Sequence, residues 1–261
     1  MLLTANYNDA STDMSLARKD ALVYSTLYLV RHGQTVFNTR LLIQGRCDSP
    51  LTELGRDQAR AAAEWLGERG VRFDAVFSSP AERACATAEM LWAGPYVRLT
   101  GLQERSFGEL EGTDVLALPK PMGDYPVGFG GEREGDLKRR LNEAMLGIMR
   151  GRYSGVGAAE GSPEVGSVWV NPIPGRSDAP VESCAVRPQP AGAPSSDAVL
   201  VVSHGAACKA FAQMWSHLAE VELPSPFPNC CVLVYRFDGE GFHLVEAADP
   251  AAHLGGEGLP I

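Results

Sequence analysis

The sequence predicts an α/β protein, a three-layer α/β/α sandwich around a mostly parallel central sheet. Short apolar runs with strand character alternate along the chain with segments in which apolar residues recur at helical spacing. Two of these runs end in a histidine followed by a glycine, at His32 and at His204. The chain has 261 residues, 45% of them hydrophobic, so it can bury the core of one large domain of this class.

The first half of the chain predicts strands that alternate with helices. Leu27 to Val30 form a continuous apolar run, typical of a strand buried on both faces, which Gly33 ends. Apolar and small residues at helical spacing from Leu51 to Leu66, with Thr52 as the N-cap, indicate the first helix. The remaining elements of this half are a short strand over residues 74–78, a helix over 81–91 and a short strand over 97–99.

The second half predicts a helix, a long loop and a closing pair of strands. Apolar residues at 137, 141, 144 and 148 fall on one helical face, whereas residues 151–198 are rich in Gly, Pro, Ser and Ala. We interpret that stretch as a long loop or flexible insertion, either functional or disordered. The elements after it are a strand over 198–202, a helix over 207–218 and a hairpin of strands over 231–237 and 242–246.

These elements indicate one domain with appendages. We expect a polar N-terminal extension over residues 1–24 and a domain over residues 25–261, with the flexible insertion at about 151–197. The N-terminal residues lack the apolar core of a signal peptide and no stretch reaches membrane-spanning length, so neither secretion nor a membrane partner is expected. Six cysteines without metal-ligand spacing fit reduced thiols in a cytoplasmic protein.

The net charge and the two strand ends together indicate a small anionic ligand. A net charge of -9 argues against nucleic acid as a partner, because binding a phosphate backbone needs a broad basic surface. In open α/β sheets ligands bind outside the carboxyl ends of the strands, where Arg31, His32 and His204 are expected. Taken alone, each residue also fits a plainer role, as a hydrogen-bonded histidine at a strand end, a surface arginine or a buried structural histidine.

Several blocks of residues occur in a characteristic order along the chain. The blocks are Arg31, His32, Gly33, Thr35 and Asn38, continued by Gln44, Gly45, Asp48, Pro50, Leu51, Thr52 and Gly55; Ser78, Ser79, Pro80, Arg83, Thr87 and Ala88; Leu102, Glu104, Phe107, Gly108, Glu111 and Gly112; and Ser203, His204 and Gly205. In this order they resemble the signature of the histidine phosphatase superfamily, also called phosphoglycerate mutase-like. The resemblance implies a phosphoglycerate mutase-like fold and a histidine phosphatase domain over residues 25–261.

The resemblance also implies a role for each of eight residues. His32 would attack phosphorus and become transiently phosphorylated, and Glu104 would protonate the leaving oxygen and then activate water. The implied substrate-binding residues are Arg31, Asn38, Gln44, Gly45, Arg83 and His204. No metal is required by this scheme, because arginine and histidine take the place of a cation, and no cofactor is expected.

Two of these assignments have alternatives in the sequence. Without the resemblance, Arg83 would be assigned to a helix-surface ion pair with Glu82 or Glu89. Glu109 and Glu111 compete with Glu104 as the acid, and a solvated acidic loop would fit all three. Glu104 can serve as a general acid only if the pKa of its carboxyl is raised.

The resemblance favours a metal-independent phosphatase of small phosphomonoesters. Gln34, where mutases of this family more often have an acidic residue, and the segment from Phe107 to Gly112 look like the phosphatase branch. A cofactor-dependent phosphoglycerate mutase is the first alternative, and a catalytically silent phosphate-binding or interaction module is the second. The expected partner is a small phosphorylated substrate, and a homodimer is left open.

Overall fold

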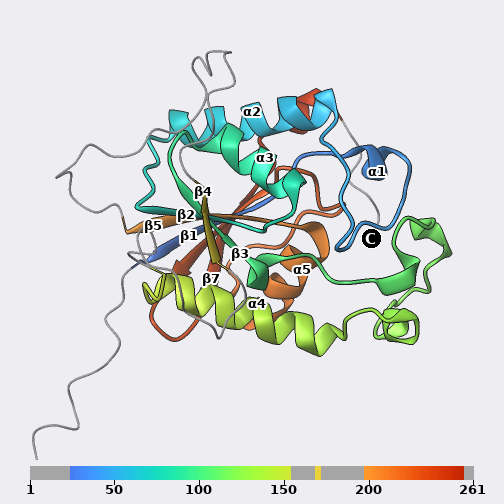
Figure 1. Ribbon diagram of the computed structural model, residues 1–261. Coiled ribbons are helices and arrows are strands. Elements are labelled where there is room, and N and C mark those ends of the chain that lie inside the picture. Colours follow the sequence, from blue (N-terminus) through green and yellow to red (C-terminus); the bar gives the residue numbers. More distant parts are fainter. Residues whose placement is uncertain (1–23, 154–167, 172–196, 256–261) are drawn as a thin grey trace, which may run out of the picture.

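A seven-stranded mixed sheet forms the centre of the protein. The computed structural model describes residues 24–153, 168–171 and 197–255 (Figure 1). The strands, in the spatial order β4-β3-β2-β5-β1-β6-β7, are β1 Thr26–Arg31, β2 Ala75–Ser78, β3 Tyr96–Leu99, β4 Val168–Asn171, β5 Ala198–Ser203, β6 Val232–Phe237 and β7 Phe242–Ala248. The four central strands from β3 to β1 are parallel, and β4, β6 and β7 pair antiparallel at the flanks. The predicted α/β fold with a parallel centre is confirmed.

Helices cover both faces of the sheet, as the three-layer prediction requires. The longer helices are α2 Glu53–Glu68 and α3 Glu82–Leu91 on one face, and α4 Glu134–Met149 and α5 Gly205–Met214 on the other (Figure 1). Because successive strand residues point to opposite faces, β5 places Val199 and Val201 in the core under α4 and α5, and Leu200 and Val202 in the core under α2 and α3. Both faces of β5 are therefore buried, as its continuous apolar sequence predicts.

The short helices of the connecting segments were not predicted. They are α1 Val36–Thr39 and the 3-10 helices Thr100–Leu102, Gly108–Leu110, Val115–Ala117, Tyr125–Phe129, Ser216–Leu218 and Ala252–Leu254. An element of three to five residues is too short to show a helical period in its sequence. The predicted helix over 207–218 accordingly divides into α5 and a separate 3-10 turn at Ser216–Leu218.

The predicted long loop contains one strand. Val168–Asn171 pairs antiparallel with β3 as the edge strand β4, so the prediction of an unbroken loop over residues 151–198 is wrong at these positions. Four residues of strand character among Gly and Pro are too few to predict a strand with confidence from periodicity alone. Residues 1–23, 154–167 and 172–196 lie outside the described residues, so the predicted extension, insertion and domain limits stay predictions.

Two further expectations concern the cysteines and membrane spans. Within the described ranges Cys47, Cys85, Cys208, Cys230 and Cys231 are free thiols, and Cys184 lies outside these ranges. None of the helices in the described ranges is both long enough and apolar enough to span a membrane.

A close contact between two glycines fixes the segment that follows β1. A Cβ atom on Gly33 would lie 2.3 Å from the carbonyl oxygen of Gly55, and one on Gly55 would lie 2.1 Å from the carbonyl oxygen of Gln34. Thr52 caps α2 by accepting a hydrogen bond from the Gly55 amide, as predicted. The loop after His32 therefore rests directly on the first turn of α2, which holds the end of β1 in place.

We expect Gly55→Ala to lower the free energy of unfolding by about 1–3 kcal/mol, because the added methyl group meets backbone that cannot move aside cheaply. Gly67→Ala, in the same helix, is the matched control, since nothing lies within 4 Å of its Cβ position. Alanine's better helix propensity should leave that variant unchanged or more stable by up to about 1 kcal/mol. Urea unfolding of both proteins measures the difference, and equal stabilities would contradict the proposed contact.

Candidate active site

The carboxyl ends of β1 and β5 bring the two predicted histidines together. The strands are parallel neighbours in a register that pairs Arg31 with Ser203, so His32 and His204 follow at the same edge of the sheet. The His32 amide donates to the Ser203 carbonyl at 3.0 Å, and the two imidazole ring centres lie 5.3 Å apart. The strand ends thus form one site, at the position expected for a ligand crevice.

The hydrogen bond of His32 to the backbone fixes its tautomer. Its Nδ1 lies 2.7 Å from the carbonyl oxygen of Gly33, which can only accept, so Nδ1 carries the proton. The other ring nitrogen, Nε2, has no hydrogen-bond partner in the described part of the chain. Burial, followed by the charges of Arg83 and Arg31, holds the pKa of His32 well below its usual value. His32 is therefore a neutral imidazole with a free Nε2 lone pair.

His204 is fully buried and is oriented by a serine. Its Nε2 lies 2.7 Å from the hydroxyl of Ser79, which also accepts a hydrogen bond from the Ala81 amide at 3.4 Å. The Nδ1 of His204 is buried without a partner among the described residues. Burial and then the charge of Arg83 lower the pKa of His204 well below its usual value. His204 is thus a neutral imidazole whose Nδ1 has no partner within the described ranges.

The two predicted arginines are buried and held by backbone carbonyls. Arg31 donates from Nη1 to the carbonyl of Phe227. Arg83 donates to the carbonyls of Cys47 at 3.0 Å and Gly45 at 2.9 Å, and its ion-pair partner is Asp48 at 3.0 Å. The alternative of a surface ion pair with Glu82 or Glu89 is therefore wrong. Within the described ranges, the Nε atoms of both arginines are buried and lack a partner.

Asn38 and Gln44 are fixed by the cap of the short helix α1. Thr35 caps this helix, and its amide donates to Oδ1 of Asn38 at 3.0 Å. Asn229 donates from its side chain to the same oxygen at 3.4 Å and to the His32 carbonyl at 2.9 Å. The Thr35 hydroxyl donates to Oε1 of Gln44 at 2.7 Å. In both amides the oxygen is occupied, so the NH₂ groups are the donors that each can offer to a ligand.

Glu104 is buried against the first turn of α5. Its Oε1 accepts from the amides of Arg105 at 2.8 Å and Ala207 at 2.9 Å, and Oε2 accepts from the amide of Ala206 at 2.9 Å. Burial raises the pKa of the Glu104 carboxyl above its usual value, although the amide hydrogen bonds act in the opposite direction. The raised pKa that an acid role requires is therefore present.

The two competing carboxylates have other environments. Glu111 accepts from the amides of Arg46 at 2.9 Å, Cys47 at 2.6 Å and Phe107 at 3.1 Å. Burial would raise the pKa of Glu111, but these amide hydrogen bonds together lower it. Glu109 is exposed. Of the three candidates only Glu104 borders the pocket that contains His32.

Arg140 on α4 holds the backbone that carries Glu104. Its guanidinium donates to the carbonyls of Gly101 at 3.0 Å, Gln103 at 2.7 Å and Glu104 at 2.9 Å. It also binds both carboxylate oxygens of Glu132, at 2.6 and 2.8 Å. A guanidinium that makes several hydrogen bonds fixes the position of the groups it binds. The position of the Glu104 backbone therefore depends on α4, a helix that lies well after Glu104 in the sequence.

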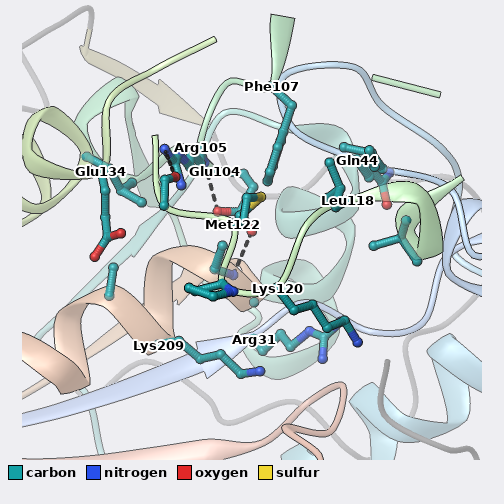
Figure 2. A pocket seen from close by; sticks show the side chains of 18 of the residues that line it. Arg31, Gln44, Glu104, Arg105, Phe107, Leu118, Lys120, Met122, Glu134 and Lys209 are labelled. Carbon is teal, nitrogen blue, oxygen red and sulfur yellow. Dashed lines mark hydrogen bonds between the residues drawn. The ribbon is translucent and has the colours of Figure 1, made fainter. Parts of the chain in front are cut away.

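His32 lines a pocket of about 550 Å³. Figure 2 shows this pocket with other lining residues labelled, among them Arg31, Gln44 and Glu104. Five of the predicted site residues border this pocket: Arg31, His32, Asn38, Gln44 and Glu104. Arg83, His204 and Gly45 do not border it, which differs from the substrate-side position expected for Gly45. Gly45 instead packs closely, since a Cβ atom there would lie 2.4 Å from Oε1 of Glu111.

Several residues that build the site had no assigned role in the sequence. Ser79 and Asp48 lie within the recognised blocks, but their partners His204 and Arg83 become apparent only in the structure. Asn229 lies outside the blocks, and a polar residue just before the apolar strand β6, antiparallel to β1, is the signal that could have identified it. Within the described ranges, no three His, Cys, Asp or Glu side chains come together to hold a metal ion.

Comparisons with known proteins identify relatives of two activities. Residues 27–156 match the family model of the histidine phosphatase superfamily, branch 1. The chain is 45% identical over 107 residues to a 2,3-bisphosphoglycerate-dependent phosphoglycerate mutase of Methylorubrum populi, covering 39% of this chain and 50% of that protein. It is 31% identical over 124 residues to a broad-specificity phosphatase of Saccharomyces cerevisiae, covering 44% and 54%. The matches thus span about half the length of these curated relatives.

The fold is also similar to that of a solved structure. The phosphoglycerate mutase of Bacillus anthracis superposes with a TM-score of 0.60, covering 91% of this chain and 98% of that chain at 20% sequence identity. At this identity the similarity shows the fold, which agrees with the phosphoglycerate mutase-like architecture predicted from the sequence blocks.

Proposed function

Because this chain belongs to the histidine phosphatase superfamily, we propose that it hydrolyses small phosphomonoesters, without a metal ion, through a phosphohistidine formed on His32. The observation that carries the proposal is the tautomer of His32, whose Nδ1 proton is held by the Gly33 carbonyl. This hydrogen bond leaves the lone pair of Nε2 available for attack on phosphorus. The lowered pKa of His32 keeps that nitrogen unprotonated at neutral pH.

Glu104 completes the proposed reaction as acid and base. In the first step Nε2 of His32 bonds to phosphorus while the phosphorus–oxygen bond to the alcohol breaks and the Glu104 carboxyl gives its proton to the leaving oxygen. In the second step the Glu104 carboxylate takes a proton from water, which attacks the phosphohistidine. The phosphorus–nitrogen bond then breaks and releases inorganic phosphate. The burial of Glu104 in the same pocket supports both roles.

Unpartnered buried donors support a phosphate as the ligand. Seven buried side-chain nitrogen or oxygen atoms in the described ranges lack a hydrogen-bond partner. Four of the seven belong to predicted site residues: Nε of Arg31, Nε2 of Gln44, Nε of Arg83 and Nδ1 of His204. A buried donor left unpaired costs about 1–3 kcal/mol, so the unpaired donors of Arg31 and Gln44, which border the pocket that contains His32, favour a ligand with several acceptor oxygens.

Phosphoglycerate mutase activity is the second candidate. The 45% identical relative is a mutase, and Lys120 and Lys209 border the same pocket as His32. Positive charge at those positions would hold the second anionic group of a phosphoglycerate. Gln34, where mutases more often carry an acidic residue, favours the phosphatase.

The function is tested by measuring phosphate release from a panel of phosphomonoesters in EDTA, together with interconversion of 3-phosphoglycerate in the same samples. We expect release without interconversion. His32→Ala should reduce release to background, and His217→Ala, which removes an exposed histidine, should retain full activity. Interconversion faster than release would assign the protein to the mutases, and absence of both would support a silent binding module.

Glu104→Gln should slow the reaction most for phosphates with poor leaving groups, because these need the acid's proton. In the unchanged protein kcat/KM should fall as pH rises through the raised pKa of Glu104, since ionisation removes that proton. The glutamine side chain does not ionise, so this alkaline decline should disappear in the variant. If the variant slowed the reaction of all substrates equally and kept the alkaline decline in kcat/KM, Glu104 would be excluded as the general acid.

A further inference from the structure

The pocket in front of His32 has two chemically different sides. In the view of Figure 2, Arg31, Lys120 and Lys209 lie along one side, and Phe107, Leu118 and Met122 lie along the other, which also carries Gln44, Glu104 and Arg105. A volume of about 550 Å³ is within the range of pockets that enclose organic ligands considerably larger than a phosphate group. The pocket is therefore amphipathic, and the part beyond the phosphate site must accommodate the alcohol portion of the ester.

The apolar side of the pocket is built on paired backbone. The Ile43 amide donates to the Thr113 carbonyl and the Gly112 amide to the Ile43 carbonyl, both at 2.8 Å. The Val115 amide donates to the Leu41 carbonyl, also at 2.8 Å. These hydrogen bonds join two segments that are far apart in the sequence into a short antiparallel ribbon. We call this apolar side of the pocket, with Phe107, Leu118 and Met122, the apolar wall. Because its backbone is paired, the fold sets the shape of the wall.

A small apolar core stabilises this ribbon. Ile43, Phe107 and Val115 are buried together, and Leu118 and Met122 pack against them. Leu118 and Met122 nevertheless stay half-buried and border the pocket. Apolar surface that faces water inside a concave site gains free energy when an apolar ligand group covers it. The wall thus offers binding energy to a hydrocarbon group.

We propose that this wall makes the enzyme selective for phosphomonoesters of apolar alcohols, an inference that rests on the proposed phosphatase function. With the phosphate at His32 and Arg31, an alkyl or aryl group extends along Phe107, Leu118 and Met122. A glycerate or sugar in that position would place hydroxyl groups against side chains that cannot hydrogen-bond to them. The substrate class is therefore alkyl and aryl phosphates, in preference to phosphoglycerates and sugar phosphates.

A series of linear alkyl phosphates isolates this effect. Ethyl, butyl and hexyl phosphate have closely similar leaving groups, so differences in kcat/KM report contacts with the alkyl chain. We expect kcat/KM to rise by up to about fourfold per methylene group and to exceed that for 3-phosphoglycerate. A flat or falling series, or a preference for 3-phosphoglycerate, would overturn the inference.

Two leucines of the same loop give a matched pair of variants. Leu118 borders the pocket, whereas Leu116 is 56% exposed and does not. Leu118→Asn should lower kcat/KM for hexyl phosphate by about tenfold and leave ethyl phosphate little changed, and Leu116→Asn should change neither. Equal effects of the two variants on kcat/KM for hexyl phosphate would contradict the proposal that the apolar wall contacts the alkyl chain.

The two proposals fail in different ways. If p-nitrophenyl phosphate is hydrolysed in a reaction that requires His32 but alkyl chain length has no effect, the phosphatase function stands and the selectivity is wrong. If no phosphate is released from any monoester, including p-nitrophenyl phosphate, both proposals are wrong.

Discussion

The parallel pairing of β1 with β5 is the constraint on which the site depends. The two strands are far apart in the sequence, yet their register puts His32 and His204 side by side at one edge of the sheet. Apolar side chains on both faces of β5 hold this register, because a slip of one residue would exchange the two cores. The contact between Gly33 and Gly55 then fixes the loop that follows His32.

Burial at this edge sets the protonation states that the chemistry needs. Desolvation and the neighbouring guanidinium groups lower the pKa of both histidines, and desolvation raises that of Glu104. These opposite shifts favour a neutral nucleophile and a protonated acid at the same pH. The buried charges of Arg31 and Arg83 attract an anion, which a protein with a net charge of -9 would otherwise repel.

The sequence could predict the reactive side chains better than the residues that position them. The strand ends predict His32 and His204, because the end of a buried strand is visible as an apolar run that stops at a glycine. The family resemblance assigns the acid role to Glu104. The structure distinguishes Glu104 from Glu111 because Glu104 borders the pocket that contains His32 and burial raises the pKa of its carboxyl, whereas the pKa of Glu111 is lowered.

The contacts made by remote elements could not be predicted. Arg140 reaches the backbone at Glu104 from α4, and Asn229 reaches the His32 carbonyl from the start of β6. Neither contact can be read from the spacing of residues in the sequence, because each depends on how separate elements pack in the folded chain. The apolar wall formed with Leu118 was missed for the same reason, because its two segments pair only in the folded chain.

Identification of the phosphorylated residue tests the central claim most directly. Glu104→Gln should form the phosphoenzyme from p-nitrophenyl phosphate, whose leaving group needs little acid, and should hydrolyse it slowly because the base is absent. After an alkaline quench, mass spectrometry of the peptides should find the phosphate on His32, with a burst of one p-nitrophenol per protein molecule. A phosphate on any other residue, or steady turnover with no phosphorylated peptide, would contradict the account.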